Sequence, residues 1–309
     1  MNIQQLEYII AVDQLRHFVQ AADQCCVTQP TLSMMIKKLE DELNIKIFDR
    51  TKQPIVPTAI GRQIIDQARV VLREAGRLTE MAQHYNGDLS GELRVGIIPT
   101  IAPYLLPLFV NTFTESYPQI RLQVFEMITE KILAELKHGN IDVGLVATSS
   151  DDSSLSETLL YHERFYVYAS GTSELYRMKY ILPEAIDPRE LWLLEEGHCF
   201  RTQIQKLCEL RRNSQSQSFQ YRSGSIETLI RMVDRSGGIT ILPEMAMMEL
   251  PADRQPNIRH FQAPVPARQV CLVVNREQVK SHLIEALRST IIEIIPDSLR
   301  TQADDVAVL

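Results

Sequence analysis

No run of apolar residues in this sequence approaches the ~20 that a helix needs to span a bilayer. The first ten residues, MNIQQLEYII, lack the basic stretch and the small-residue cleavage site of a secretory signal. Glycine-rich phosphate loops, internal repeats and low-complexity tracts are also missing. The five cysteines include no CxxC pair and are odd in number, which argues against a zinc ribbon and against a disulfide scaffold. We therefore expect a cytoplasmic protein that needs no metal or cofactor and keeps its cysteines reduced.

What is present is the composition of an ordinary globular protein, with 309 residues, 45% hydrophobic and 23% charged. The length suits roughly two domains. The net charge of −7 argues at first against nucleic acid, because proteins that bind it usually carry basic surfaces. However, residues 1–90 hold 10 Lys+Arg against 11 Asp+Glu, and the remainder holds 22 against 28. The acidic excess therefore belongs mostly to the later part of the chain.

The first 60 residues are typical of a helix-turn-helix. Apolar periodicity predicts helices over residues 4–15 and 18–22, then a third helix with Thr28 as N-cap and Pro30 in its first turn. Small residues at Ala21 and Ala22 allow the helices to approach closely, and the third helix can then enter a major groove. On this helix we predict DNA contacts from Thr28, Gln29, Pro30, Thr31, Ser33, Lys37 and Lys38.

Two short strand-like segments follow, at residues 45–48 and 55–57, with a polar turn between them. Arg50 and Lys52 on this turn are predicted to form a wing that contacts the adjacent DNA backbone. A helical protein–protein module with a solvated polar face is the alternative.

A long helix is predicted from Thr58. Its apolar positions step by 4, 3, 4, 3 and 4 residues, which is the seam of a coiled coil over about three heptads. The seam predicts pairing with a second chain, although it would also suit packing of the helix on its own domain. The seam residues are Ile64, Ala68, Val71, Ala75, Leu78 and Ala82.

Beyond a linker at residues 86–91, the pattern changes to strands that alternate with helices such as 130–137 and 226–233. This alternation predicts parallel βαβ units, arranged as two α/β lobes with a cleft between them. The expected domains are therefore 1–58, a linker helix at 59–86, and 87–309. The predicted strands are 93–98, 120–125, 143–147, 165–169, 191–194, 239–242 and 270–274.

The segment from His198 to Cys208 carries two cysteines nine residues apart. Cys199 follows the predicted strand 191–194, so it should lie at the N-terminus of a helix, where free N–H groups favour a thiolate. His198 and Arg201 are expected to add hydrogen-bond donors or positive charge there.

If residues 199–208 are helical, their nine steps separate the two cysteines by about 13.5 Å along the axis. A disulfide needs Cα atoms within about 7 Å, so bridging requires this segment to unfold. The pattern predicts a switch between a reduced helix and an oxidised, refolded state, and the polar tract 211–218 would tolerate such a rearrangement. The alternative is a pair of inert, buried cysteines.

The N-terminal residues resemble the winged helix-turn-helix of LysR-type transcriptional regulators. The resemblance implies a linker helix, an effector domain like the periplasmic binding proteins, a homodimer through the linker helices, and tetramers on DNA. The residues that carry it are Phe18, Ala21-Ala22, Thr28-Gln-Pro-Thr-Leu-Ser33, Lys38-Leu-Glu40, Leu43, Phe48-Asp-Arg50, Thr58 and Gly61.

The effector part is similar to the hydrogen-peroxide-sensing activators of that family. The similarity implies that Cys199 is the peroxidatic residue and that it forms a disulfide with Cys208, the resolving residue. It further implies RNA polymerase as a partner of the activator and a thiol reductant that resets it. By the same similarity, Thr100, Thr129, His198 and Gln203 line the peroxide pocket, and Arg268 lowers the pKa of the sensing thiol. The similar stretches are Ile97-Ile-Pro-Thr100, Pro103-Tyr-Leu-Leu-Pro107, Gly197-His-Cys-Phe-Arg-Thr-Gln203 with Cys208, Ser225-Ile-Glu-Thr-Leu229 and Gly237-Gly-Ile-Thr-Ile-Leu-Pro243.

One position departs from the pattern, because Thr202 stands where those activators carry an aspartate. The other three cysteines, Cys25, Cys26 and Cys271, are expected to be packing residues without a redox role. Two rival functions stay open: a regulator that binds a small metabolite between its lobes, and a thiol peroxidase that uses the same chemistry in turnover.

Overall fold

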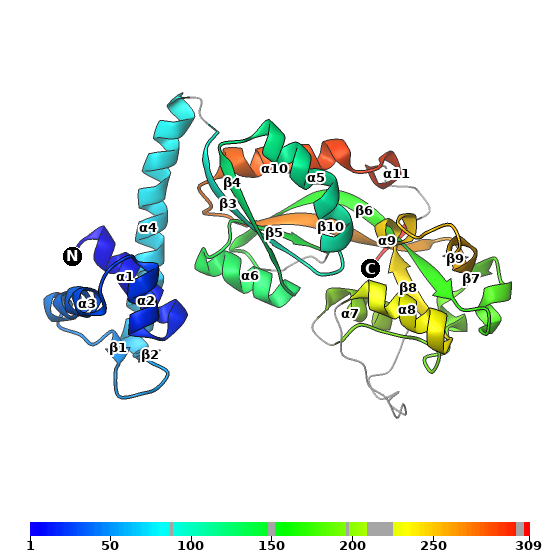
Figure 1. Ribbon diagram of the computed structural model, residues 1–309, viewed down its shortest axis with the longest axis horizontal. Coiled ribbons are helices and arrows are strands. Elements are labelled where there is room, and N and C mark those ends of the chain that lie inside the picture. Colours follow the sequence, from blue (N-terminus) through cyan, green and yellow to red (C-terminus); the bar gives the residue numbers. More distant parts are fainter. Residues whose placement is uncertain (87–88, 148–151, 196–197, 209–224, 301–305) are drawn as a thin grey trace. The chain divides into compact units, whose positions relative to one another are not determined.

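The computed structural model describes residues 1–86, 89–147, 152–195, 198–208, 225–300 and 306–309, without the side chains of 79–86. The chain divides into two compact units, Met1–Asp88 with Glu277–Val279, and Leu89–Arg276 with Lys280–Leu309 (Figure 1). Within the described ranges, no helix combines the length and the hydropathy that a membrane crossing requires. The fold is the mixed α/β arrangement that the sequence predicts.

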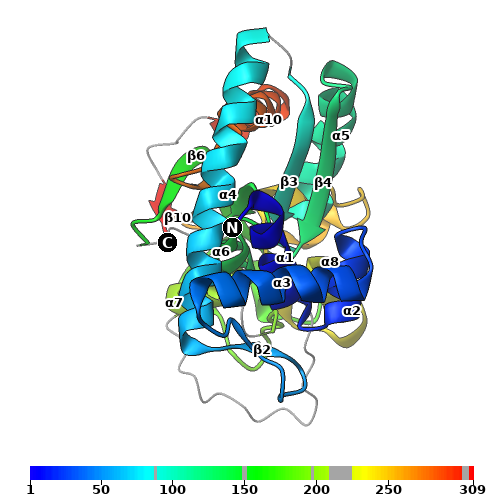
Figure 2. The same ribbon diagram turned by 90° about the vertical axis from the view of Figure 1, so that its left-hand side faces the viewer.

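The first unit is a three-helix core followed by a two-stranded wing and a long helix. Thr28 is the N-cap of α3, as predicted, because its hydroxyl accepts a hydrogen bond from Thr31 N–H, and Pro30 lies in the first turn. Figures 1 and 2 show α1–α3 grouped near the N-terminal part of α4, and α1 packs against this helix. The elements are α1 (Ile3–Leu15), α2 (Phe18–Gln24), α3 (Gln29–Leu43), β1 (Phe48–Asp49), β2 (Val56–Pro57) and α4 (Ala59–Asn86).

The wing begins later than predicted. Of the expected strand 45–48, only Phe48 pairs, and it lies opposite Pro57. The preceding N–H groups are taken by Glu40, whose main-chain oxygen binds Ile45 N and whose carboxylate accepts from Ile47 N at 2.8 Å. The chain then passes so close to α4 that a Cβ at Gly61 would lie 2.0 Å from the Ile47 carbonyl oxygen. Only glycine fits at this crossing.

The predicted seam of α4 is divided between two environments. Ala68 is 2% exposed in the core of its own unit, and Ile64 packs against that core. Further along, Val71 and Leu78 are 37% and 71% exposed, while Ala75 is partly exposed and Ala82 lies outside the described side chains. The alternative of packing on the same domain therefore holds for the first part of the seam, and an apolar face is left open on the later part.

The second unit is a nine-stranded sheet with helices on its faces, arranged as two lobes (Figure 1). The strand order is β4-β3-β5-β10-β6-β9-β7, with β8 paired to β6 and β11 to β10. Its strands are β3 (Gly91–Ile97), β4 (Ile120–Glu126), β5 (Val143–Val146), β6 (Leu155–Ala169), β7 (Tyr180–Ile181), β8 (Ile239–Pro243), β9 (Ile258–Phe261), β10 (Val265–Asn275) and β11 (Val306–Val308). Its helices are α5 (Ala102–Ser116), α6 (Thr129–His138), α7 (Cys199–Leu207), α8 (Ile226–Ser236), α9 (Glu244–Met248), α10 (Ser281–Ile294) and α11 (Asp297–Arg300), with 3-10 turns at Glu174–Arg177, Pro183–Ala185 and Gln255–Asn257.

Two expectations about this sheet were wrong. Parallel pairing holds for β3 with β4 and β5, but β10 runs antiparallel to β5 and β6, and β6 runs antiparallel to β8 and β9. Two long strands, β6 and β10, pass through both lobes, and this sets directions that local alternation does not predict. Residues 191–194 form no strand, because only Leu191 bridges to Ile239.

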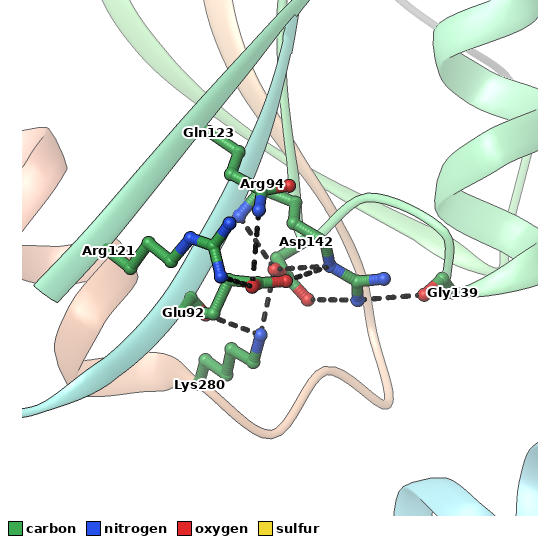
Figure 3. A network of polar contacts seen from close by, with 7 residues as sticks. All are labelled: Glu92, Arg94, Arg121, Gln123, Gly139, Asp142 and Lys280. Atoms are coloured by element: carbon green, nitrogen blue, oxygen red, sulfur yellow. Dashed lines mark hydrogen bonds and ion pairs between the residues drawn. The ribbon is translucent and has the colours of Figure 1, made fainter. Parts of the chain in front are cut away.

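A charged network holds the N-terminal edge of the parallel strands (Figure 3). Arg94 donates to both oxygens of Asp142 and to the Gly139 carbonyl, and Lys280 donates to Asp142 at 2.9 Å. Burial alone would raise the pKa of Asp142, but the hydrogen bonds and charges of Arg94 and Lys280 lower it overall. Ion pairs therefore hold the N-terminal ends of these strands together. The candidate site lies at the opposite, carboxyl ends of the same strands.

Candidate functional site

The polar residues predicted to contact DNA lie on or next to α3. Thr28, Pro30, Thr31, Lys37 and Lys38 are exposed, and Gln29 and Ser33 are partly exposed. The hydroxyls of Thr28 and Thr31 are 2.8 Å apart and share a hydrogen bond.

The two basic residues of the wing have different surroundings. Arg50 lies against the helices, where its guanidinium donates to Ser33 Oγ at 3.1 Å, pairs with Glu40 and covers the Phe18 ring at 5.0 Å. Lys52 is 65% exposed and only reaches Asp49 at 3.9 Å. Sequence reasoning missed Glu40, which is 2% exposed and joins α3 to the wing. The signal for it was an acid beside Leu39 on the apolar face of the helix.

The two cysteines of the predicted switch occupy the two ends of one helix. Cys199 is the first residue of α7 and Cys208 is its C-cap, and both are free thiols. The helical premise is confirmed, so the two cysteines are about 13.5 Å apart along the axis, well beyond the reach of a disulfide. Both side chains are partly buried against the core of the unit.

The Cys208 thiol is strongly disfavoured as a thiolate. Burial, with a smaller contribution from Glu184, raises the pKa of Cys208 to about 12. In the helical state this residue is therefore almost entirely protonated at neutral pH.

His198 was expected to add a hydrogen-bond donor or positive charge, and its burial disfavours the charged form. The side chain is 5% exposed, and burial lowers its pKa although Glu195 and Glu126 act in the opposite direction. The imidazole is therefore neutral at pH 7 and can serve as a hydrogen-bonding group. The other expected donor, Arg201, is used within the lobe, where it donates to the Leu194 carbonyl at 2.5 Å.

Arg268 is fully buried and connects three elements. Its guanidinium donates to Glu163 at 2.8 Å and to Thr100 Oγ1 at 2.9 Å, and it lies 5.1 Å from the centre of the Phe200 ring, next to Cys199. None of these contacts is to the Cys199 sulfur. Glu163, 1% exposed on β6, was missed in the sequence, where it stands between His162 and Arg164 with no local sign of its burial.

Two of the predicted pocket residues carry buried oxygens without a partner in the described part of the chain. Thr129 opens α6 and Gln203 lies in α7, and they are 6% and 7% exposed. Among the residues that the structure describes, neither Thr129 Oγ1 nor Gln203 Oε1 finds a hydrogen-bond partner, while Gln203 Nε2 donates to the Ala147 carbonyl at 2.8 Å. This bond ties α7 of one lobe to the carboxyl end of β5 in the other. Together with the Thr100–Arg268–Phe200 contacts, it brings α7 to the carboxyl edge of the parallel strands.

Thr202, which departs from the family pattern, and the three cysteines that lie away from α7 have different surroundings. Thr202 is exposed on α7. Cys271 is buried, and burial raises its pKa to about 11, in keeping with a packing residue. Cys25 is partly buried, but Cys26 is exposed in the turn before α3, so the expectation that it packs was wrong. Its backbone φ of 55° lies in the left-handed region, at the reversal of the chain before α3. The tract 211–218 and Gly197 lie outside the described residues.

Comparison with known proteins defines the class. Residues 3–62 match the bacterial regulatory helix-turn-helix protein of the lysR family, and residues 86–294 match the LysR substrate binding domain. The chain belongs to the LysR family of bacterial regulators.

Within that family the chain is similar to OxyR and to the hydrogen peroxide-inducible genes activators. It is 35% identical to the "Hydrogen peroxide-inducible genes activator" of Haemophilus influenzae, over 88% of this chain and 90% of that protein. It is 37% identical to the "DNA-binding transcriptional dual regulator OxyR" of Escherichia coli, over 80% of each chain. A full-length OxyR variant from Pseudomonas aeruginosa superposes with a TM-score of 0.80 at 33% identity, over 96% of this chain and 99% of that one.

Proposed function

We propose that the protein is a DNA-binding transcription activator that senses hydrogen peroxide through a reversible disulfide between Cys199 and Cys208. The observation that carries the proposal is the placement of one free thiol at each end of α7. The names of its relatives, hydrogen peroxide-inducible activators, supply the signal and the output.

The chemistry takes two steps. The Cys199 thiolate attacks one oxygen of hydrogen peroxide, the O–O bond breaks, and hydroxide leaves and takes up a proton to become water. The resulting sulfenic acid is then attacked by Cys208, which forms the S–S bond and releases a second water. A dithiol reductant reverses the switch by thiol–disulfide exchange and is itself oxidised to a disulfide.

The second step requires α7 to unwind, for two independent reasons. The helix holds the cysteines about 13.5 Å apart along its axis, and a disulfide needs Cα atoms within about 7 Å. The helix also keeps Cys208 protonated, since burial raises its pKa to about 12, and only the thiolate is a good nucleophile. Unwinding removes both obstacles together.

The buried polar groups on α7 and at the start of α6 suit a small polar ligand. Hydrogen peroxide carries two O–H donors and two acceptor oxygens. Thr129 Oγ1 and Gln203 Oε1 are buried acceptors with no partner among the described residues, and the neutral His198 adds a further group. Arg268 positions Thr100 in this pocket through its hydrogen bond to Oγ1. Because Glu163 pairs with Arg268, the positive field that Arg268 exerts on Cys199 is reduced in the helical state.

The other parts of the chain have roles in the output. Residues 1–58 bind double-stranded DNA through α3 and the wing, 59–86 form the dimerisation helix, and 87–309 form the sensor. The exposed Val71 and Leu78 support a homodimer through α4, which assembles further into a tetramer. RNA polymerase is the partner of the activator, and the cytoplasm is the compartment that offers DNA and a thiol reductant together.

Refolding around Cys199 and Cys208 changes the packing between effector domains and hence the spacing of the DNA-binding domains. DNase footprints of the reduced and oxidised protein should therefore differ. Identical footprints would contradict this coupling while leaving the redox chemistry intact.

The central test is mass spectrometry of the peroxide-treated protein after its free thiols are alkylated. A Cys199–Cys208 disulfide peptide is expected, and it should vanish on treatment with a dithiol. Cys271→Ser is the matched control, because it removes a buried thiol and should leave this peptide unchanged. If the protein is oxidised without this peptide, the proposed mechanism is wrong.

A measurement of peroxide consumption separates the sensor from a thiol peroxidase. A sensor consumes about one peroxide per chain in the absence of reductant and turns over slowly with it. Its slow step is the refolding of α7. Rapid consumption of many equivalents in the presence of a dithiol would assign the chemistry to catalysis.

A further inference from the structure

Met34 is an exposed apolar side chain in the middle of the predicted recognition helix. It is 63% exposed, whereas Leu32, Ile36 and Leu39 of the same helix are completely buried. Single exposed apolar residues are common on protein surfaces, so its exposure alone carries no argument. Its position on the helix does.

Successive residues of an α-helix are rotated by about 100°, so the faces of α3 can be assigned from the residue numbers. Leu32 and Ile36 lie about 160° from Met34, on the opposite side of the helix. Thr31 and Lys37, three residues before and after Met34, lie about 60° to either side of it. Met34 is therefore at the centre of the face that points away from the core of its unit.

The groups around Met34 indicate which partner covers this face. Thr31 is exposed, and Lys37 and Lys38 are exposed and form no ion pair within the part of the chain that the structure describes. A second protein would gain little from leaving two cations beside an apolar centre. Double-stranded DNA pairs the cations with phosphates and brings base edges to the centre of the helix face.

Among the base edges of the major groove, the apolar group is the C5-methyl of thymine. We propose that Met34 determines sequence specificity by contacting this methyl group. The thioether side chain is unbranched and flexible, so it can follow the methyl without a fixed rotamer. The inference rests on the proposed DNA-binding function and adds the chemical group that one residue reads.

The test uses uracil, which differs from thymine only by the missing methyl. Duplexes are first selected from a random-sequence library with the full-length reduced protein. Each thymine of the selected site is then replaced by uracil in turn, and the affinity is measured for the wild-type protein and for Met34→Ala. We expect the wild type to lose about fourfold at one thymine in each half-site, the factor that corresponds to burial of one carbon. Met34→Ala should bind thymine and uracil equally at that position.

Two variants serve as controls. Met34→Leu keeps an apolar side chain of similar size and should keep the preference for thymine. Val19→Ala removes a 49% exposed apolar side chain from α2 of the same unit and should leave the whole uracil profile unchanged. Circular dichroism should be the same for all variants, because neither Met34 nor Val19 is part of the core.

The inference is overturned if the wild type tolerates uracil at every position, or if Met34→Ala keeps the thymine preference. In both cases the selected site would still establish DNA binding. If instead the wild-type protein selects no sequence from the library, it is the proposed function that fails.

Discussion

The recognition helix α3 and the sensor helix α7 have opposite designs. α3 has 15 residues, a side-chain cap at Thr28 and a left-handed C-cap at Asn44. α7 has nine residues and no side-chain cap at His198, and a buried oxygen of Gln203 has no hydrogen-bond partner within the described ranges. Each cap contributes about 1 kcal/mol and short helices are marginal, so α3 is held by more local interactions than α7. The proposed unwinding of α7 agrees with this difference.

The largest effect is expected when the reactive thiol is removed from α7 and α3 is left unchanged. Cys199→Ser should abolish the response to peroxide, a loss of at least about a hundredfold, because a serine hydroxyl is not ionised at neutral pH. DNA affinity of the reduced protein should stay unchanged, since α3 lies in a separate unit. Footprinting with and without peroxide checks the loss of the response, and binding measurements check the DNA affinity. If Cys199→Ser still responds to peroxide, a different residue is the sensor.

The second prediction uses pH to expose the instability of α7. Burial raises the pKa of Cys208 to about 12, so the helix holds a proton that the unwound segment releases near an ordinary thiol pKa of ~8.5. The stabilisation from this group is complete below about pH 8.5 and is lost as the pH rises toward the folded value. Disulfide formation from the sulfenic acid should accelerate about tenfold per pH unit between pH 7 and pH 10.

The measurement is the lifetime of the Cys199 sulfenic acid, trapped with a sulfenic-acid reagent at successive times and read by mass spectrometry. An exposed thiol of ordinary pKa would level off above about pH 8.5. Such a plateau would show that Cys208 is already free in the reduced protein.

A smaller change destabilises α7 without touching the site. Lys206 is exposed near its end, and glycine there costs about 1 kcal/mol of helix stability, which favours unwinding about fivefold. Disulfide formation in Lys206→Gly should accelerate by the same factor. Arg231→Gly, at an exposed position of α8, is the control and should leave the rate unchanged. Equal acceleration in both variants would mean that general destabilisation, and not α7, controls the step.

The smallest predicted effect concerns the DNA-binding unit and tests whether Lys52 of the wing contacts DNA. Lys52 reaches only Asp49 and is 65% exposed, so Lys52→Ala should weaken DNA binding about threefold and reduce the salt dependence by about one phosphate contact. The rate of oxidation should not change. Lys131→Ala, an exposed lysine on α6, is the control for nonspecific charge. An unchanged salt slope would remove Lys52 from the interface.

The sequence is informative where structure is local. The cap at Thr28, the helix that begins at Cys199 and the linker helix could all be predicted, because caps and periodicity are encoded within a few residues. Local patterns do not say which distant residue pairs with which. Glu163 meets Arg268 across 105 positions, and the antiparallel course of β6 and β10 depends on the same long-range pairing. Met34 was missed because polar and basic side chains were the ones expected to contact DNA, although helical spacing already places Met34 opposite Leu32 and Ile36.

The two long strands of the sensor limit how it can move. β6 and β10 pair from Ala267–Arg164 to Asn275–Leu155, and β6 continues into the second lobe to pair with β8 and β9. This continuous pair of strands resists bending in the plane of the sheet. The two lobes are therefore poorly suited to closing on a ligand. A conformational change at α7 would then alter the shape of the domain surface. A neighbouring subunit would respond through direct contact with that surface, and no hinge motion between the lobes would be needed.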